Sequence, residues 1–490
     1  MKYVLSIDQG TTSSRVIIYN SRFEKIGMGQ KAFQQYFPKP GWVEHDAEEI
    51  WQSVLSSIEE ALSEVKDPDF SVKKIASIGI TNQRETVVLW NKKTSQLLGK
   101  AIVWQDRRSA DLCTKLKKSK IGKKIEFLTG LVLDPYFSGT KLSLALKEIP
   151  SSENIAFGNI DTFLLWKLTH GSAHATDVSN ASRTLLMNLK TLSWDPFILK
   201  ALKIPAQILP EIKDSDAEFG KTKNLKLLPD GIPIHGILGD QQAALFGQSC
   251  FDAGDSKITY GTGAFMLTNT GPQIVRSKGA LSTVAWKAGG KCLYALETSV
   301  FIAGAAVQWL RDGLKLFDHS SKIEALAQEV KSSEGVFFIP ALSGLGSPYW
   351  VPEARGVLGG LTRGSTQAHV ARACLEGIAH SVADTFESLG QKKKNSMIRV
   401  DGGASQNNLL MSYQASLLQK TLERPKDVET TARGAAMMAA LGMKLITLGD
   451  LKKQKDTDIT YAPSLKAKEA QKAKGLWTRR VKALILMSKT

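Results

Sequence analysis

SIDQGTTSSR, residues 6–15, is the stretch that decides the fold. The runs on either side of its turn, Tyr3–Ile7 and Val16–Tyr19, are apolar enough to form two short strands. The turn between them has one carboxylate, Asp8, then a glycine and four consecutive hydroxyl residues. Such a turn lets backbone N–H groups approach an anion, and the hydroxyls add donors. We therefore predict a hairpin that holds phosphate oxygens, although many Ser/Thr-rich turns only satisfy their own backbone.

A second segment, SKITYGTGAFMLT at residues 256–268, repeats this order of strand, Gly/Thr turn and strand. The first turn reads GTT from residue 10, and the second reads GTG from residue 261. The repeat predicts two related halves that face one another. The sequence contains neither GxxxxGK[ST] nor a GxGxxG that opens a helix, which disfavours P-loop and dinucleotide-binding enzymes.

Length, charge and cysteine content set further limits. The 490 residues exceed what one hydrophobic core holds, so we expect two large domains. The net charge of +17 is spread out and is densest in the tail after Lys452, without a recognition motif. We favour a solvated basic surface over specific nucleic-acid binding, with an unknown anionic partner as the alternative. The four cysteines form no CxxC pair and no apolar run is long enough for a membrane span, so we expect a cytoplasmic protein without membrane insertion.

Strand-like runs alternate with helical patterns along the chain. Residues 74–80, 86–90, 101–104 and 233–239 are predicted strands, and residues 304–317 and 370–389 are predicted helices. This mixture predicts α/β domains whose sheets are covered by helices. Because no low-complexity linker separates the halves, we expect them to pack with a cleft between them.

Motifs in a fixed order resemble the FGGY family of carbohydrate kinases, in particular those members that phosphorylate glycerol. They are SIDQGTTSSR (6–15), PKPGWVEHD (38–46), GITNQRET (79–86), AIVWQDRR (101–108), TGLVLDPYFSGTK (129–141), TDVSNASRTLL (176–186), GDQQAALFGQ (239–248), YGTGAFM (260–266), GLGSPYW (344–350) and RVDGGASQNN (399–408). The resemblance covers residues 1 to about 445.

The resemblance implies two actin/hexokinase-like (ribonuclease H-like) α/β domains with an interdomain cleft. Residues 1–247 would carry the glycerol site, the first phosphate loop and the catalytic aspartate, and residues 248–490 the second phosphate loop and the adenosine site. The implied reaction is the phosphorylation of glycerol by ATP and Mg²⁺ to sn-glycerol 3-phosphate, the first step of glycerol catabolism, in a homo-oligomer, a dimer or tetramer. Two alternatives stay open: a kinase of another polyol or a pentulose, which Arg84-Glu85 after TNQ disfavours, and a non-catalytic ATP switch like actin or Hsp70.

Two aspartates are candidates for catalysis and metal binding. Asp240 follows the predicted strand 233–239, where α/β sheets present functional groups, and it can accept a proton from an attacking hydroxyl. Its alternative role is to cap the helix that follows, but the resemblance implies the general base. The resemblance also implies Mg²⁺ at Asp8 and Asp240, with water between Asp8 and the ion because Mg²⁺ sheds water reluctantly. The alternative role of Asp8 is a turn cap.

The acceptor site is predicted to be a polyol clamp. Arg84 and Glu85 follow a strand directly and offer paired donors and acceptors for vicinal hydroxyls, unless they form a surface ion pair. The resemblance implies that Trp104 and Phe265 cover the carbon backbone of the substrate, whereas otherwise both belong to the core. The full set implied for the acceptor is Arg84, Glu85, Trp104, Tyr136, Asp240, Gln241 and Phe265.

The nucleotide site is implied by the motifs. The two turns contribute hydroxyls and an arginine, and glycines at two helix starts let the backbone approach ATP closely. The implied residues are Thr11, Thr12, Ser13, Arg15, Thr262, Gly304, Gln308, Gly403 and Asn407. A tight strand-helix turn is the alternative role of Gly403.

Three further features are predicted to lack a function. His380 lies in a predicted helix, so we expect it to be packed or solvated. Glu44-His45-Asp46 are adjacent and cannot easily converge on one metal ion. Some FGGY members are inhibited by fructose 1,6-bisphosphate at a Gly- and Arg-rich loop, and some are activated by phosphorylation of a histidine in this region. The corresponding stretch here, GKTKNLKLLPDGIP (220–233), has no glycine cluster, arginine or histidine, so we predict that its leucines pack and that both forms of regulation are absent.

Overall fold

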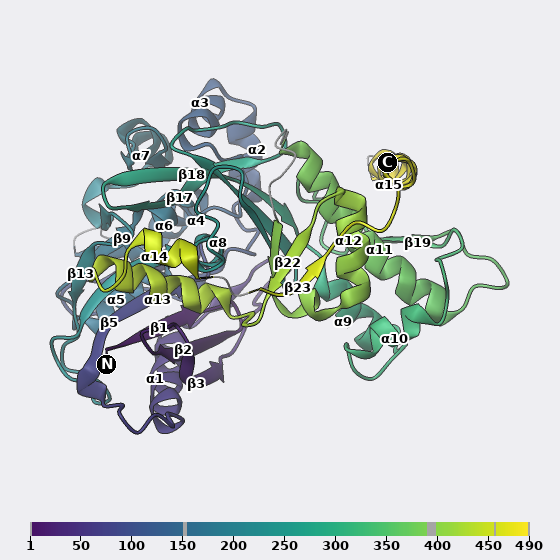
Figure 1. The fold of residues 1–490 in the computed structure, drawn as a ribbon. Coiled ribbons are helices and arrows are strands. Elements are labelled where there is room, and N and C mark those ends of the chain that lie inside the picture. Colours follow the sequence, from purple (N-terminus) through teal and green to yellow (C-terminus); the bar gives the residue numbers. More distant parts are fainter. Residues whose placement is uncertain (1, 150–153, 390–397, 455–456, 489–490) are drawn as a thin grey trace.

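The computed structural model describes residues 2–149, 154–389, 398–454 and 457–488. Two large sheets organise the chain, and helices lie against them (Figure 1). The first sheet is built from the N-terminal half of the sequence and the second from the C-terminal half. The predicted α/β architecture with two sheets is therefore confirmed.

The first sheet has the strand order β13-β14-β5-β1-β2-β3. Its strands are β1 (Tyr3–Gln9), β2 (Ser13–Tyr19), β3 (Lys25–Ala32), β5 (Ile75–Asn82), β13 (Glu218–Lys221) and β14 (Pro233–Gly239). Strands β1, β5 and β14 are parallel, with Asp8 beside Thr81 and Gly239 beside Asn82. Their carboxyl ends therefore meet at one edge, where α/β sheets place ligands.

The second sheet has the strand order β17-β18-β16-β15-β21-β22-β23. Its strands are β15 (Ser256–Tyr260), β16 (Ala264–Gly271), β17 (Leu281–Ala288), β18 (Lys291–Val300), β21 (Ile398–Asp401), β22 (Leu422–Pro425) and β23 (Thr457–Tyr461). Strand β15 forms an antiparallel hairpin with β16 and a parallel pair with β21. This repeats the pairing of β1 with β2 and β5, so the predicted pair of hairpins is confirmed.

Helix α13 (Thr430–Gly442) crosses from the second half of the chain to the first sheet. It contacts β1, β5, β14 and helix α8 (Asp240–Gly247). A Cβ on Gly79 of β5 would lie 2.4 Å from the carbonyl oxygen of Ala435, so the close approach requires glycine there. Because α13 packs on the first half, the domain boundary between residues 247 and 248 stays a prediction.

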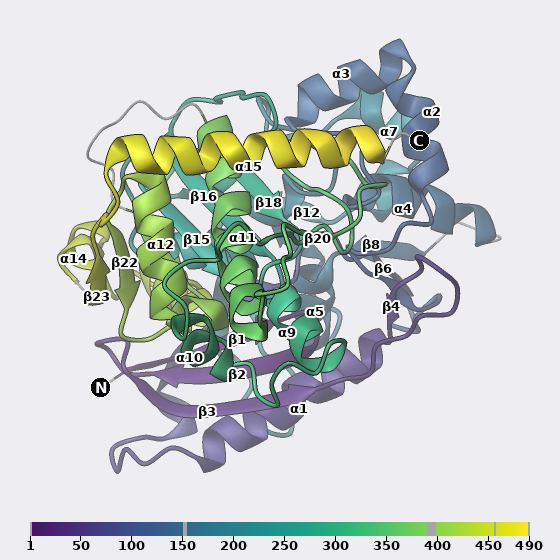
Figure 2. The same ribbon diagram turned by 90° about the vertical axis from the view of Figure 1, so that its right-hand side faces the viewer.

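The outer helices complete the two layers. Helix α1 (Ala47–Ser63) lies against β2 and β3. Helices α11 (Gln367–Ser388) and α12 (Asn408–Leu418) pack together in the second half, and α15 (Ala467–Met487) lies across them on the outside (Figure 2). Within the residues that the structure describes, no helix is both long and apolar enough to span a membrane.

The smaller elements connect these layers. The other α-helices of the described residues are α2 (Ala110–Lys117), α3 (Lys120–Thr129), α4 (Ser138–Ala145), α5 (Ile160–Leu168), α6 (Val178–Ala181), α7 (Pro196–Leu202), α9 (Gly304–Asp312), α10 (Lys322–Gln328) and α14 (Leu448–Lys453). The other strands there are β4 (Glu44–His45), β6 (Val88–Asn91), β7 (Ala101–Ile102), β8 (Ile155–Gly158), β9 (Ala175–Asp177), β10 (Met187–Asn188), β11 (Ser193–Trp194), β12 (Glu211–Lys213), β19 (Phe337–Ile339) and β20 (Val357–Gly359).

Most predicted elements are confirmed, but two end early. Strands β5 and β14 and helix α11 match the predictions, and β6 begins two residues after residue 86. The predicted strand 101–104 is wrong after Ile102, because the chain turns there and the N–H of Asp106 donates to the carbonyl of Val103. The predicted helix 304–317 is wrong after Asp312, because Gly313 disfavours a helix and Lys315 has a left-handed φ of 54°.

Candidate active site

The turn after β5 directs two oppositely charged side chains into the interior. Arg84 and Glu85 are only 3% and 2% exposed, so they do not form a surface ion pair. Glu85 has a φ of 61°, a left-handed backbone that costs a non-glycine residue on the order of 1–3 kcal/mol. The hydroxyl of Ser138 donates to the carbonyl oxygen of Glu85 at 3.1 Å. The strained turn is therefore held from outside, and both side chains are fixed.

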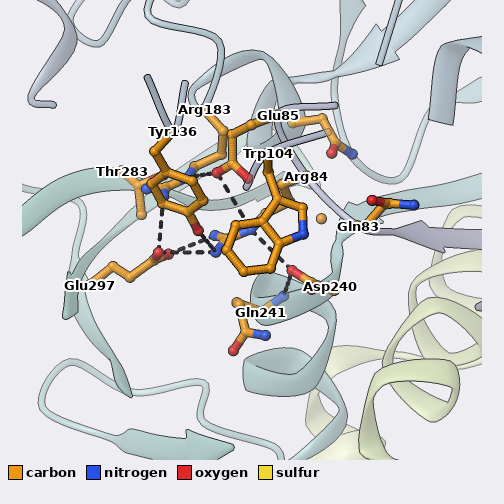
Figure 3. A network of polar contacts seen from close by, with 12 residues as sticks. Gln83, Arg84, Glu85, Trp104, Tyr136, Arg183, Asp240, Gln241, Thr283 and Glu297 are labelled. Atoms are coloured by element: carbon orange, nitrogen blue, oxygen red, sulfur yellow. Dashed lines mark hydrogen bonds and ion pairs between the residues drawn. The ribbon is translucent and has the colours of Figure 1, made fainter. Parts of the chain in front are cut away.

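Arg84 is the centre of a buried ionic network (Figure 3). Its guanidinium lies 2.6 and 2.9 Å from the two carboxylate oxygens of Glu297, and 3.0 Å from Oδ1 of Asp240. Arg183 lies 2.9 Å from Glu297 and 2.7 Å from Glu85. Burial raises the pKa of Glu85. Burial acts in the same direction on Glu297, but Arg183 and Arg84 together hold the pKa of Glu297 below its ordinary value.

Sequence reasoning missed Arg183 and Glu297. Arg183 stands in the motif TDVSNASRTLL, and Glu297 is a single carboxylate in the otherwise apolar and hydroxyl-bearing end of β18. A charge in a buried strand requires a partner, and this signal could have pointed to Glu297. The sequence contains no signal that joins β18 to the end of β5.

Asp240 lies where β14 ends and α8 begins. Gly239 is the N-cap of this helix, so Asp240 occupies the first helical position and not the cap itself. Oδ1 of Asp240 accepts from the N–H of Gln241 at 2.6 Å and faces Arg84. The side chain stays 33% exposed, which leaves the carboxylate accessible to a hydroxyl.

Asp8 lies at the end of β1, opposite Arg15 in the hairpin. Burial raises the pKa of Asp8 to about 6, while Arg15 acts to lower it and the carboxylate of Asp240 to raise it further. A cation would neutralise this pair of carboxylates. Mg²⁺ is held in proteins by one or two carboxylates and keeps several of its waters. The two aspartates therefore fit Mg²⁺.

Three aromatic side chains form a wall beside the network. The ring of Trp104 lies 5.5 Å from that of Tyr136 and 6.4 Å from that of Phe265, both edge-on. The indole N–H of Trp104 donates to the hydroxyl of Thr11 at 3.0 Å, and Arg84 lies 3.4 Å from the hydroxyl of Tyr136. These contacts join the first turn to the predicted acceptor residues.

Lys141 holds the segment that carries Tyr136, and it was not predicted. Its buried ammonium donates to three successive carbonyl oxygens, those of Pro135 (2.9 Å), Tyr136 (2.6 Å) and Phe137 (3.1 Å). Burial lowers the pKa of Lys141 to about 7. The motif 129–141 includes this lysine, but no local pattern indicates its partners.

The first turn is closed by the N–H of Gly10, which donates to the carbonyl of Ser13 at 2.9 Å. The hydroxyl of Ser13 accepts from Gln30, and the side chain of Thr12 is exposed. The guanidinium of Arg15 contacts Gln30 and forms an ion pair with Glu429, just before α13. Arg15 is thus already paired in this structure.

The second turn is built against the start of α9. The carbonyl of Thr262 accepts from the N–H groups of Ala303 and Ala305, and the N–H of Gly304 donates to the carbonyl of Gly261. A Cβ on Gly304 would lie 2.6 Å from that carbonyl oxygen, so the contact requires glycine. The side chains of Thr262 and Gln308, the latter one helical turn into α9, are exposed.

The predicted adenosine segment adjoins the second hairpin. Gly402 has a φ of 83°, and a Cβ there would lie 2.5 Å from the carbonyl oxygen of Tyr260. A Cβ on Gly403 would meet no atom within 4 Å, so the chain is open on that side. Asn407 caps α12, because its side chain accepts from the N–H of Leu410 at 2.8 Å.

The features predicted to lack a function are packed or paired. His380 stacks on Trp477 at 5.0 Å, and burial lowers its pKa to about 3. His45 contacts Gln35, whereas Glu44 pairs with Arg108. The structure thus gives these histidines partners other than a metal.

The loop 220–233 packs as predicted. Leu228 is buried, and Leu225 and Leu227 lie against the core of the first half. Lys221, Lys223, and Lys226 are exposed. The loop therefore presents flexible ammonium groups rather than a backbone cradle.

Comparisons with known proteins identify relatives of the whole chain. The family described as "FGGY family of carbohydrate kinases" matches through its N-terminal domain at residues 3–247 and its C-terminal domain at residues 256–443. Glycerol kinase of Bdellovibrio bacteriovorus is 54% identical over 450 residues, 90% of each chain. Glycerol kinase of Myxococcus xanthus is 49% identical over 98% of this chain and 99% of that protein. The crystal structure of Plasmodium falciparum glycerol kinase with ADP is 36% identical, with a TM-score of 0.90 over 99% of this chain and 98% of that one.

Proposed function

Because the chain belongs to the FGGY family of carbohydrate kinases, we propose that it transfers the γ-phosphoryl group of ATP to glycerol, giving sn-glycerol 3-phosphate and ADP. Full-length relatives named glycerol kinase support this reaction, as does the similarity to a glycerol kinase structure with ADP. Neither a kinase of another acceptor nor an ATP switch is favoured by these relatives.

One observation carries the proposal. The accessible carboxylate of Asp240 contacts Arg84, and Arg84 also approaches the hydroxyl of Tyr136 inside the aromatic wall. A carboxylate that can accept a proton therefore lies beside groups that can form hydrogen bonds with hydroxyls. An ATP switch has no need of an acceptor site of this kind.

In the proposed reaction, Asp240 accepts the proton of the glycerol hydroxyl that attacks the γ-phosphorus of ATP. Arg84, Glu85, Tyr136 and Gln241 orient the acceptor through hydrogen bonds. Trp104 and Phe265 cover its carbon atoms and exclude water, which would otherwise take the phosphoryl group. Asp8 and Asp240 would hold Mg²⁺, with water between Asp8 and the ion, and the bound ion would neutralise charge on the phosphates.

We propose that the nucleotide binds between the two turns. The proposed contacts are Thr11, Thr12, Ser13 and Arg15 from the first half and Thr262, Gly304, Gln308, Gly403 and Asn407 from the second. The halves, divided between residues 247 and 248, close on both substrates by a hinge motion. We further propose that the enzyme is a cytoplasmic homo-oligomer, a dimer or tetramer.

The test is a coupled assay of ADP release with ATP and Mg²⁺, run without acceptor and then with glycerol, a tetritol and pentuloses. We expect glycerol to give the highest kcat/KM and the reaction without acceptor to be slow. A higher kcat/KM with a pentulose would contradict the acceptor. ADP release that is independent of every acceptor would support the ATP switch instead.

A further inference from the structure

A second buried lysine stands between the two halves of the site. Lys257 of β15 is 0% exposed, and its Nζ donates to the hydroxyl of Thr259 at 2.7 Å and to Oε1 of Gln241. Thr259 lies two residues before the second turn, and Gln241 directly follows Asp240 (Figure 3). The ammonium therefore joins the strand that leads to the phosphate turn to a residue of the acceptor site.

The chemistry of the two groups fixes the orientation of the amide. An ammonium has only donors, so the atom of Gln241 that faces Lys257 must be the amide oxygen. The NH₂ group then points away from the lysine. Within the described residues, no hydrogen bond from Nε2 of Gln241 to another protein atom is formed, so this donor is available to a ligand.

Stability does not account for a lysine at this position. Burying an ammonium is costly, and even a complete buried ion pair is often no more stabilising than apolar residues of similar volume. Burial lowers the pKa of Lys257 to about 8, while the carboxylates of Asp401 and Asp240 act to raise it. A costly group that contacts an acceptor residue points to a role in function.

We propose that Lys257 is a positioning residue that holds the amide of Gln241 with its NH₂ group toward the acceptor, so that Gln241 donates to a hydroxyl oxygen of the substrate. The inference rests on the proposed phosphorylation of glycerol. Without the lysine, the amide can rotate and offer its oxygen, which suits a hydroxyl proton but not a hydroxyl oxygen. The acceptor would then bind in a mixture of orientations.

The test is a double-mutant cycle of Lys257→Met and Gln241→Met, read as KM for glycerol and KM for ATP. Each single variant should raise KM for glycerol roughly tenfold, the effect of losing one strong hydrogen bond. Gln241→Met removes the donor to glycerol, and Lys257→Met removes the charged group that orients this donor. KM for ATP should change less than about twofold, which is within the spread of exposed substitutions. The double variant should be no worse than Gln241→Met, because Lys257 acts through that amide.

Two results would overturn the proposal. One is an effect of Lys257→Met that persists undiminished in the Gln241→Met background, because the lysine would then act on Asp240 or on the phosphates. The other is an equal rise of both KM values, which would indicate a structural role. Lys291→Met, an exposed lysine at the start of β18, is the matched control.

A second variant and a second acceptor keep the test decisive. If Lys257→Met does not fold, Lys257→Gln replaces it, since a neutral amide of similar length fills the space and should give an intermediate KM for glycerol. If the wild-type enzyme does not use glycerol, the proposed function fails. The cycle is then run on the best acceptor of the panel, where the same coupling is expected. Absence of turnover with every acceptor would overturn both proposals.

Discussion

The two Gly/Thr turns have the same backbone plan but different surroundings. Two residues before its glycine, the first turn has the carboxylate Asp8, and the second has the hydroxyl Thr259. The first turn is joined to the acceptor site, because Thr11 accepts from Trp104. The second is joined by backbone hydrogen bonds to the start of α9.

This difference supports the proposal that the acid–base chemistry lies in the first half, while the second turn joins the first in holding the nucleotide. The first turn lies at the same sheet edge as Asp240, so the carboxylates of Asp8 and Asp240 lie there together. The same turn contacts the acceptor site through Thr11 and Trp104. The second turn has no charged side chain, and the ammonium near it belongs to Lys257. Substitutions of Asp240 and Arg84 should therefore change turnover or acceptor binding, whereas a substitution in the second turn itself should change ATP binding.

The largest effect is expected for Asp240→Asn. The substitution keeps the shape of the side chain but removes its basicity, so kcat should fall by roughly 10²–10⁴-fold, the range for a lost acid–base group. ATP affinity, measured by calorimetry, should stay close to that of the wild type. A purified, folded variant with nearly normal kcat would contradict the assignment of chemistry to the first half.

Arg84→Ala should affect the acceptor selectively. Because the guanidinium is proposed to touch glycerol and not ATP, KM for glycerol should rise roughly 10–100-fold, the effect of losing hydrogen bonds to a charged group. KM for ATP should change little. Arg22→Ala, at a 77% exposed arginine, is the control. Equal effects on both constants would mean that Arg84 supports closure or folding through Glu297.

Asp8→Asn should stabilise the metal-free protein while it impairs catalysis. Burial raises the pKa of Asp8 from 3.8 to about 6. Between these two pH values, the folded state therefore keeps a proton on Asp8 that the unfolded chain has lost. Stability therefore falls as pH rises through this window, and the cost of the charged group is complete above about pH 6. Chemical denaturation at pH 7.5, in the presence of a metal chelator, should show that Asp8→Asn has a free energy of unfolding on the order of 1–3 kcal/mol above that of the wild type. This difference should shrink as the pH is lowered toward 4.5.

The control for this prediction is Asp111→Asn, at an exposed aspartate in the first turn of α2. It should leave stability nearly unchanged at both pH values. An Asp8→Asn variant that is less stable than the wild type at pH 7.5 would show that the carboxylate stabilises the first turn in the absence of metal.

Local patterns could predict the hairpins and the position of Asp240, because each depends on residues close in sequence. Gly10 and Gly261 mark turns between apolar runs, and Asp240 directly follows a buried strand. These features are determined by backbone geometry and burial. The end of α9 at Gly313 was missed, since the apolar stripe continues past the residue that stops the helix.

Contacts between distant strands could not be predicted in this way. Glu297 of β18 meets Arg84 of the turn after β5, and Lys257 meets Gln241 because β15 lies beside α8. Each pair is set by tertiary packing, and the sequence around each partner reads as an ordinary strand or helix. The pairing of Arg15 with Glu429 has the same origin, since α13 returns to the first sheet.

A smaller effect separates the two turns directly. Thr262→Val removes a hydroxyl with little change in volume and should weaken ATP binding roughly 2–10-fold, the net effect of one neutral hydrogen bond. KM for glycerol should not change. Thr11→Val is the matched variant in the first turn, and it should raise both constants because Thr11 also accepts from Trp104. Unchanged ATP affinity in Thr262→Val would place the second turn outside the site.

The smallest effect is expected at the loop 220–233, which has no glycine cluster and no arginine. Binding a sugar bisphosphate requires backbone N–H groups that glycines expose or an arginine fork, whereas this loop buries Leu228 and presents three exposed lysines. Lysine charges alone can attract fructose 1,6-bisphosphate, but such binding fades with salt because exposed charges are screened within about 8 Å at physiological ionic strength. Initial rates at that ionic strength should therefore be unchanged by the bisphosphate, with weak inhibition only at low salt. Saturable inhibition that persists in salt, and that is lost when Lys221, Lys223 and Lys226 are changed to alanine, would mean that a loop in this fold needs neither a glycine cluster nor an arginine to hold phosphate.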